Sequence, residues 1–160
     1  MISLFETCLT LTGYDIRRAS NELKQIQSLS PAKFRKWQEE EKWKIARYHY
    51  DNNTFYRKKV GDNFPDKWED LPVIEKSDYQ DDLEKLISKG YTRKNTYIAN
   101  TSGSSGHPFF FVKSKDAHAM SWAYGISRYK DLGIKFGEQE ARFWGLPVDF
   151  KGLLIEKIKD

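Results

Sequence analysis

The sequence has little of what disulfide-rich, metal-stabilised or membrane-spanning domains depend on. Its 160 residues include one cysteine, Cys8, so neither an intramolecular disulfide nor a cysteine cluster for zinc can form. Its three histidines show no pair at helical metal-binding spacing, so no metal site is predicted. No run approaches the about 20 apolar residues of a membrane span. The N-terminus carries Glu6 inside its apolar run and lacks a basic start, unlike a signal peptide. We therefore expect a cytoplasmic protein.

Apolar residues are also scarce, and charge of one sign does not dominate. Hydrophobic residues make up 39% and charged residues 31% of the chain, against roughly 45–50% and about 25% in typical domains. Aromatic residues reach 15%, which excludes a disordered tail. The net charge is only +4, and basic clusters such as Arg17-Arg18 are countered by acidic ones such as Asp81-Asp82. The sequence therefore predicts no nucleic-acid partner, because such a surface would be more one-sided.

Residues 1–60 are predicted to form a helical N-terminal segment. A polar helix over residues 15–28 has an inner face of Ile16, Leu23 and Ile26. Ser30 as N-cap and Pro31 as first residue predict a second helix that runs to about residue 51 and ends or kinks at Asn52-Asn53. The expected inner stripe of this second helix is Phe34, Trp37, Glu41, Ile45 and Tyr48.

Residues 61–160 are predicted to begin an α/β domain. After a connector over residues 61–73, a capping box from Ser77 to Gln80 predicts a helix that stops at Gly90. Strands are expected at residues 95–100, 109–112 and 140–146, the second of them buried. A helix capped by Asp116 should precede the third strand. Its expected inner face is Ala119, Trp122, Ala123, Ile126 and Tyr129.

The predicted fold class is therefore α/β, a helical part followed by a β-loop-β-α-β unit. Residues 151–160 (KGLLIEKIKD) resemble the start of a helix without a stop signal. Three short strands would also make a thin sheet with edges that need covering. We therefore expect the chain to be a fragment, an incomplete portion of a larger domain.

The strongest chemical signal is the loop of residues 101–108 (TSGSSGHP), which the pattern places between two strands. Its members are Thr101, Ser102, Gly103, Ser104, Ser105, Gly106, His107 and Pro108. Glycines allow backbone amides to approach an anion closely, and hydroxyls add donors without charge. This combination suits the terminal phosphates of a nucleotide. The alternative is an ordinary flexible surface loop, since serine and glycine are common in loops.

Other motifs for phosphate binding or nucleophilic catalysis are absent. Gly103 and Gly106 are too close for a Walker loop, and no lysine follows them. A dinucleotide fingerprint would open a helix, whereas strand-like Phe109 follows here. The spacing G-x-S-x-G of a nucleophile elbow is not met. Trp122 and Tyr124 could line a pocket, although packing is the usual role of such residues, and His49 is expected on a helix surface.

The loop resembles the phosphate-binding signature of the adenylate-forming superfamily, which includes the acyl-CoA synthetases. The surrounding residues narrow the resemblance to phenylacetate–CoA ligases and the related CapK-type capsular polysaccharide biosynthesis proteins. They are Phe55-Tyr56-Arg57, Leu71-Pro72-Val73, Lys76-Ser77-Asp78, Gly133 to Gly137 (GIKFG) and Phe143-Trp144-Gly145. The resemblance covers about residues 50–150. Phe109 stands where many superfamily members have a basic residue, a feature that this branch often lacks too.

The resemblance implies a ligase that converts a carboxylate and ATP into an acyl-adenylate and pyrophosphate. The acyl group then passes to a thiol, usually that of coenzyme A. ATP with Mg²⁺ would be gripped by the loop, with Ser102, Ser104 and Ser105 as hydroxyl donors and Gly103 and Gly106 as amide positions. The adenine motif and the catalytic lysine of the family would lie beyond Asp160, so this chain alone is expected to be inactive.

Two alternatives from other classes stay open. The chain could be a non-catalytic module, such as a truncated polysaccharide-biosynthesis gene product, that binds an anion or a partner protein through exposed sheet edges. It could also be a small helical nucleic-acid binder, which would show steep salt dependence of binding and which the even charge distribution disfavours.

Overall fold

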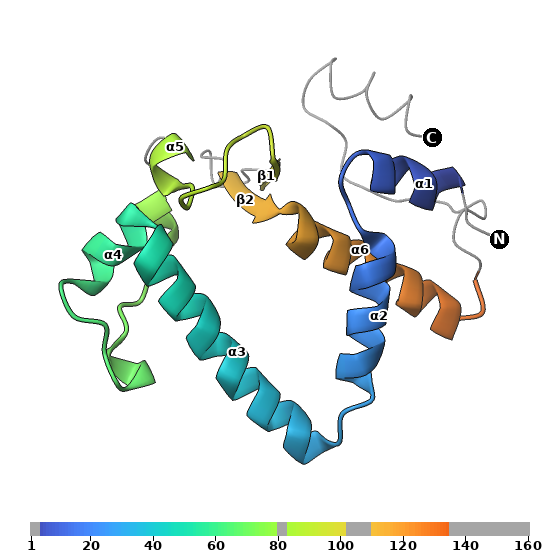
Figure 1. The fold of residues 1–160 in the computed structure, drawn as a ribbon. Coiled ribbons are helices and arrows are strands. Elements are labelled where there is room, and N and C mark those ends of the chain that lie inside the picture. Colours follow the sequence, from blue (N-terminus) through green and yellow to red (C-terminus); the bar gives the residue numbers. More distant parts are fainter. Residues whose placement is uncertain (1–3, 80–82, 102–109, 135–160) are drawn as a thin grey trace. The chain divides into compact units, whose positions relative to one another are not determined.

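The computed structural model describes residues 4–79, 83–101 and 110–134 and is mixed α/β, mostly helical with a two-stranded antiparallel sheet. The chain divides into two compact units, Met1–Arg128 and Tyr129–Asp160. The elements, drawn in Figure 1, are α1 (Leu4–Leu11), α2 (Ile16–Gln27), α3 (Pro31–Asn52), α4 (Thr54–Val60), α5 (Leu83–Leu86), β1 (Thr96–Asn100), β2 (Phe110–Ser114) and α6 (Lys115–Asp131). Within the described ranges, no helix combines the length and the apolar character that crossing a bilayer requires.

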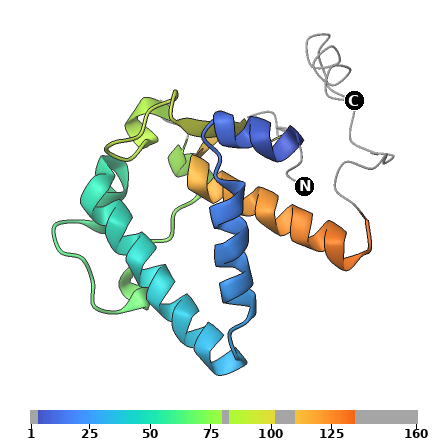
Figure 2. The same ribbon diagram turned by 45° about the vertical axis from the view of Figure 1, so that its right-hand side comes forward.

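The main apolar contact of the larger unit joins α2 to α6, which lie side by side in Figures 1 and 2. Its fully buried residues are Ile16, Ala19, Ala119 and Ala123, each 1–4% exposed. Around them pack Leu9, Tyr14, Leu23, Trp122 and Ile126. Three of the four buried residues at the contact are alanines. The predicted inner faces are confirmed in part: Ile16 and Leu23 of α2 and Ala119, Trp122, Ala123 and Ile126 of α6 lie in this core, whereas Ile26 and Tyr129 do not.

The starts of α2 and α6 are fixed by side-chain caps. Asp15 caps α2, its carboxylate accepting a hydrogen bond from the backbone amide of Arg18 at 2.9 Å. The sequence predicted Asp116 as the cap of α6, and this prediction is wrong. The hydroxyl of Ser114 accepts the hydrogen bond from the backbone amide of Ala117 at 3.1 Å, because the helix begins at Lys115, two residues earlier than a cap at Asp116 would place it. Asp116 instead forms an ion pair with Arg18 at 2.6 Å, which ties α6 to α2.

The helix predicted from Ser30 and Pro31 is present as α3, but its predicted inner stripe is wrong in its second half, while Phe34, Trp37 and Glu41 are half-buried. Ala46 and Tyr50 are buried, whereas Ile45 is 54% and Tyr48 37% exposed. The reason lies in the connector that follows α4. Phe64 of the connector packs its ring against Tyr50, with ring centroids 5.2 Å apart. The connector therefore decides which face of α3 is covered.

A layered set of rings and cations holds this connector to α3. Trp43 meets the rings of Phe64 and Trp68 edge to face, at centroid distances of 6.0 and 5.5 Å. The guanidinium of Arg47 lies 4.0 Å from the centre of the Phe64 ring, and the ammonium of Lys42 lies 4.8 Å from that of Trp68. The cluster buries aromatic surface in a chain that has few aliphatic residues. At this contact, aromatic side chains therefore provide the packing that leucines provide in many other proteins.

Asn53 joins α3, α4 and the segment around α5. As predicted, the helix ends at Asn52-Asn53, and Asn53 then caps α4 by accepting from the backbone amide of Tyr56 at 2.9 Å. Its side-chain amide also donates to the carbonyl of Leu86 at 2.8 Å and to the hydroxyl of Ser88 at 3.1 Å. Only 6% of Asn53 is exposed, so these bonds form out of contact with water.

The helix predicted from the capping box is shorter than expected. Lys76–Tyr79 form a turn of 3₁₀ helix, and only Leu83–Leu86 are α-helical in the described part of this segment. Gln80, the expected partner of Ser77, lies outside the described residues. The prediction that this helix stops at Gly90 is wrong, because α5 ends at Leu86 and Gly90, with φ of +87°, lies in the turn that follows.

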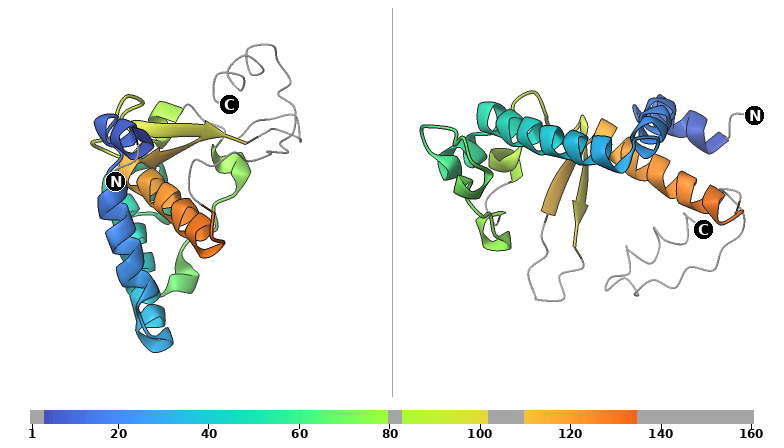
Figure 3. Two further views of the ribbon diagram at one scale, coloured as in Figure 1. Left: turned by 90° about the vertical axis from the view of Figure 1, so that its right-hand side faces the viewer. Right: turned by 90° about the horizontal axis from the view of Figure 1, so that it is seen from below.

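The two strands form a hairpin (Figure 3), and their register pairs Thr96 with Ser114 and Asn100 with Phe110. The strand predicted at residues 95–100 is confirmed. The prediction that the second strand is buried is wrong, since Phe110 is 50% exposed and the rest of β2 is half-buried. A two-stranded sheet offers too little surface to cover both faces of its strands. The third strand predicted at residues 140–146 and the helix start at 151–160 lie outside the described residues.

Candidate functional site

The candidate site is the segment of residues 101–108, which lies between β1 and β2 in the sequence. Thr101 follows β1 directly and is exposed. The remaining predicted site residues, 102–108, lie outside the described residues, so the structure describes their support rather than the residues themselves. Because Asn100 pairs with Phe110, both ends of the predicted phosphate loop leave the sheet from neighbouring positions. The hairpin thus presents residues 101–109 as one connection between two antiparallel strands.

His118 anchors β1 to α6. Its imidazole stacks on the ring of Tyr97, with centroids 3.6 Å apart and planes 11° apart, and meets Tyr14 edge to face at 5.4 Å. Its Nε2 accepts a hydrogen bond from the indole Nε1 of Trp122 at 3.1 Å. Three segments distant in sequence therefore converge on one ring. Sequence patterns gave no signal for this contact, because it joins residues of three separate elements.

The surroundings of the His118 imidazole favour its neutral form. Burial lowers its pKa from the ordinary 6.5, and the nearby ammonium of Lys113 lowers it further. Protonation would also place a hydrogen on Nε2, facing the indole N–H of Trp122, and would abolish their hydrogen bond. Its Nδ1 is buried and has no hydrogen-bond partner within the described ranges. The described geometry therefore gives His118 a packing role beneath the hairpin.

His49 was expected on a helix surface and is instead half-buried. It lies between the rings of Tyr48 and Tyr56, and its Nδ1 is 3.3 Å from the hydroxyl of Ser88. Burial lowers its pKa from the ordinary 6.5. The chain folds back over this face of α3 at Ser88, a contact that the local pattern around His49 could not reveal.

Acidification is expected to destabilise the fold between pH 7.5 and 5.5. The unfolded chain takes up protons on His49 and His118 near pH 6.5, whereas their lowered pKa values make the folded chain take them up only at lower pH. Their contribution to stability is therefore fully present well above pH 6.5, is lost as the pH falls from 6.5 toward the lower folded-state pKa values, and changes no further below those values. The measurement is the urea concentration at the midpoint of unfolding, taken at pH 7.5 and at pH 5.5. In His118→Gln the midpoint should change less with pH than in the unmodified chain, and an equal change would contradict this role of His118.

The described residues around the candidate site can be compared with the other sites that the sequence raised. Within residues 4–79, 83–101 and 110–134, no three His, Cys, Asp or Glu side chains gather to hold a metal ion. Trp122 is half-buried against His118, and Tyr124 is 54% exposed, and their lining of a pocket stays a prediction. The described part of the site consists of the two antiparallel strands β1 and β2, with Lys113 on β2.

Comparison of the chain with protein-family models, with curated proteins and with solved structures found no match.

Proposed function

We propose that this chain forms the N-terminal part of an ATP-dependent, acyl-adenylate-forming ligase similar to phenylacetate–CoA ligase. The observation that carries the proposal is the sequence of residues 101–108, which matches the superfamily's phosphate-binding signature at each signature position. The hairpin supports it, because β1 and β2 flank that segment as the resemblance requires. In finer terms, the mixed α/β architecture would be an incomplete portion of the large N-terminal domain of these enzymes.

The proposed reaction has two steps. A carboxylate oxygen attacks the α-phosphorus of ATP, the bond to the β-phosphate breaks, and pyrophosphate leaves. A thiol, in the proposal that of coenzyme A, then attacks the acyl carbon and releases AMP. The loop's contribution would be to hold the β- and γ-phosphates, with the hydroxyls of Ser102, Ser104 and Ser105 and the amides of Gly103 and Gly106 as donors. Mg²⁺ would enter the site already bound to the phosphates, because most of its ligands are oxygen atoms of water and phosphate rather than of the protein.

The donor set fits a polyphosphate by its chemistry. Hydroxyls and glycine amides donate hydrogen bonds without bringing a fixed charge, so the loop can bind and release the leaving group in the same cycle. Donors act best when a rigid support fixes them. Here the support is the hairpin, which the stack of Tyr97 on His118 attaches to α6.

The direct test is binding of Mg²⁺–ATP and Mg²⁺–pyrophosphate to this chain by isothermal titration calorimetry. Combining Ser104→Ala with Ser105→Ala should weaken binding at least about 10-fold, because hydrogen bonds to charged groups are among the strong ones. The matched control is Ser121→Ala, which removes an exposed hydroxyl from α6 and should leave binding unchanged. Equal affinities for all three chains would refute the loop assignment.

A second readout separates a ligase from a non-catalytic anion-binding module. The protein encoded by the complete gene should exchange labelled pyrophosphate into ATP only when its carboxylate substrate is present, because adenylate formation is reversible. A panel of aryl and alkyl carboxylates is the practical probe. Anion binding by the chain together with no exchange for any carboxylate would favour the module.

A further inference from the structure

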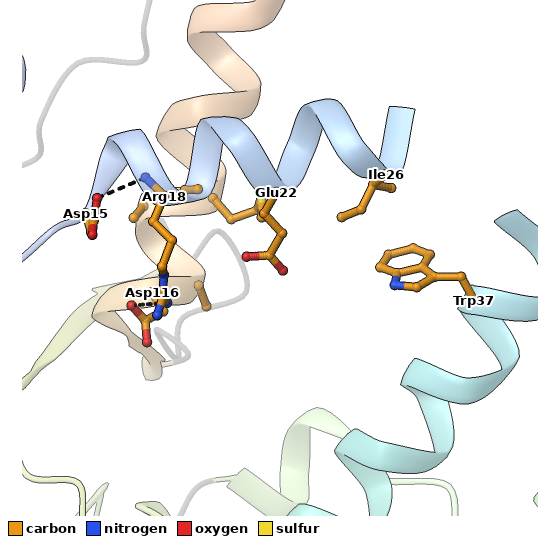
Figure 4. A pocket seen from close by; sticks show the side chains of 10 residues that line it. Asp15, Arg18, Glu22, Ile26, Trp37 and Asp116 are labelled. Atoms are coloured by element: carbon orange, nitrogen blue, oxygen red, sulfur yellow. Dashed lines mark hydrogen bonds and ion pairs between the residues drawn. The ribbon is translucent and has the colours of Figure 1, made fainter. Parts of the chain in front are cut away.

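A groove of about 360 Å³ opens where α2, α6 and the first part of α3 come together. It is lined by Asp15, Arg18, Ala19, Glu22, Ile26, Trp37, Asp116, Ala117, Ala119 and Met120. Its volume falls within the range of roughly 300–1,000 Å³ that is typical of small-molecule sites. Figure 4 shows Trp37 and Ile26 bordering one end of this space and Arg18 and Asp116 the other.

The walls of the groove combine small apolar residues with one large ring. Ala19 and Ala119 belong to the tight contact between α2 and α6, so this wall is fixed by the core. Trp37 is half-buried and stacks on Phe34, with ring centroids 5.4 Å apart, which restricts the indole. A ligand in the groove would therefore meet a preformed surface, with an aromatic ring at one end.

The charges in the groove are unbalanced toward the negative. Three carboxylates face one guanidinium, and that guanidinium, of Arg18, is paired with Asp116 at 2.6 Å. Asp15 caps α2 and lies at the positive end of that helix. Glu22 lies in the middle of α2, and no described residue supplies it with a hydrogen bond or an ion pair. In Figure 4 its carboxylate points away from α2 into the space between Asp116 and Trp37.

We propose that this groove binds a small organic cation with an alkylammonium head and a short apolar body. The head would lie between the carboxylate of Glu22 and the face of Trp37, since tryptophan is the aromatic side chain that attracts cations most strongly. Ile26 and Met120 would contact the apolar body. Anions are disfavoured by the carboxylates, so this site differs in ligand class from the hairpin loop. It stands independently of the proposed ligase function.

The test uses choline as probe and its uncharged carbon isostere, dimethylbutanol, as control. Choline should shift the indole N–H resonance of Trp37 saturably in a ¹⁵N–¹H spectrum of the whole chain. The indole of Trp68, which is 38% exposed in the separate ring cluster on the connector, is the internal control and should stay in place. Dimethylbutanol should bind about 5-fold more weakly, since it keeps the shape and loses the charge.

Two substitutions assign the contacts. Glu22→Gln should weaken choline binding about 5-fold, as expected for one carboxylate close to a cation near the protein surface, whereas Glu69→Gln on the connector should leave it unchanged. Trp37→Leu should weaken choline binding by a similar factor. Because this variant lacks the indole of Trp37, its binding is measured from the shift of the Met120 methyl resonance. An unchanged indole resonance of Trp68 would show that the fold is intact. Equal shifts of both indoles, equal binding of the alcohol, or no effect of Glu22→Gln would each overturn the proposal.

Discussion

Ala119→Asp is expected to lower the free energy of unfolding by about 4 kcal/mol or more, the largest effect of any substitution considered for this chain. Ala119 is 1% exposed and packs against α2 together with Ala123. An aspartate there would bury a carboxylate among apolar neighbours, and the α2–α6 contact has no room for the added atoms. Urea unfolding followed by tryptophan fluorescence measures the loss.

Ala117→Asp is the matched control for this experiment. Ala117 lies two residues earlier on the same helix but is exposed, so water solvates the same new carboxylate. It should change the free energy of unfolding by no more than about 0.5 kcal/mol. If Ala119→Asp and Ala117→Asp unfolded at the same urea concentration, the α2–α6 contact would not be the core of this unit.

Asn53→Ala is expected to lower the free energy of unfolding by about 3 kcal/mol. The loss has two parts. The cap of α4 disappears, which costs about 1 kcal/mol, and the carbonyl of Leu86 loses its buried donor, which costs about 1–3 kcal/mol. Since Asn53 also bonds to Ser88, the contact between α3 and the segment around α5 should loosen. Chemical denaturation gives the total, and hydrogen exchange of the amide of Lys89 reports this contact locally.

Two further variants separate the parts. Asn53→Asp keeps the oxygen that caps α4 but has no amide to donate to Leu86 and Ser88, so it should retain the cap and still be strongly destabilised. Asn52→Ala removes a neighbouring amide whose bond to the carbonyl of Tyr48 is exposed and local, and it should cost only a few tenths of a kcal/mol. A cost for Asn52→Ala equal to that of Asn53→Ala would contradict the bridging role.

Features of α3 that depend on neighbouring residues could be predicted from the sequence, whereas features that depend on distant residues could not. The ends of α3 could be predicted because Ser30, Pro31 and the Asn52-Asn53 pair act on their own backbone. The inner face of α3 could not, because Phe64 of the connector covers Tyr50 and leaves Ile45 exposed. An N-cap signal at Asn53 was available in the sequence, since an asparagine preceding Thr54–Val60 fits a helix start, but its bonds to Leu86 and Ser88 had no local signature.

The candidate site divides in the same way. The strand before the loop and most of the inner face of α6 depend on neighbouring residues, and the sequence by itself determined them, while the chemistry of the loop at residues 101–108 stays a prediction. Only the tertiary structure brought Tyr97 and Tyr14 to His118, gave the cap of α6 to Ser114 and placed Trp37 opposite Glu22. The physical reason is that turn, cap and periodicity preferences act over a few residues, whereas burial depends on which distant segment covers a face.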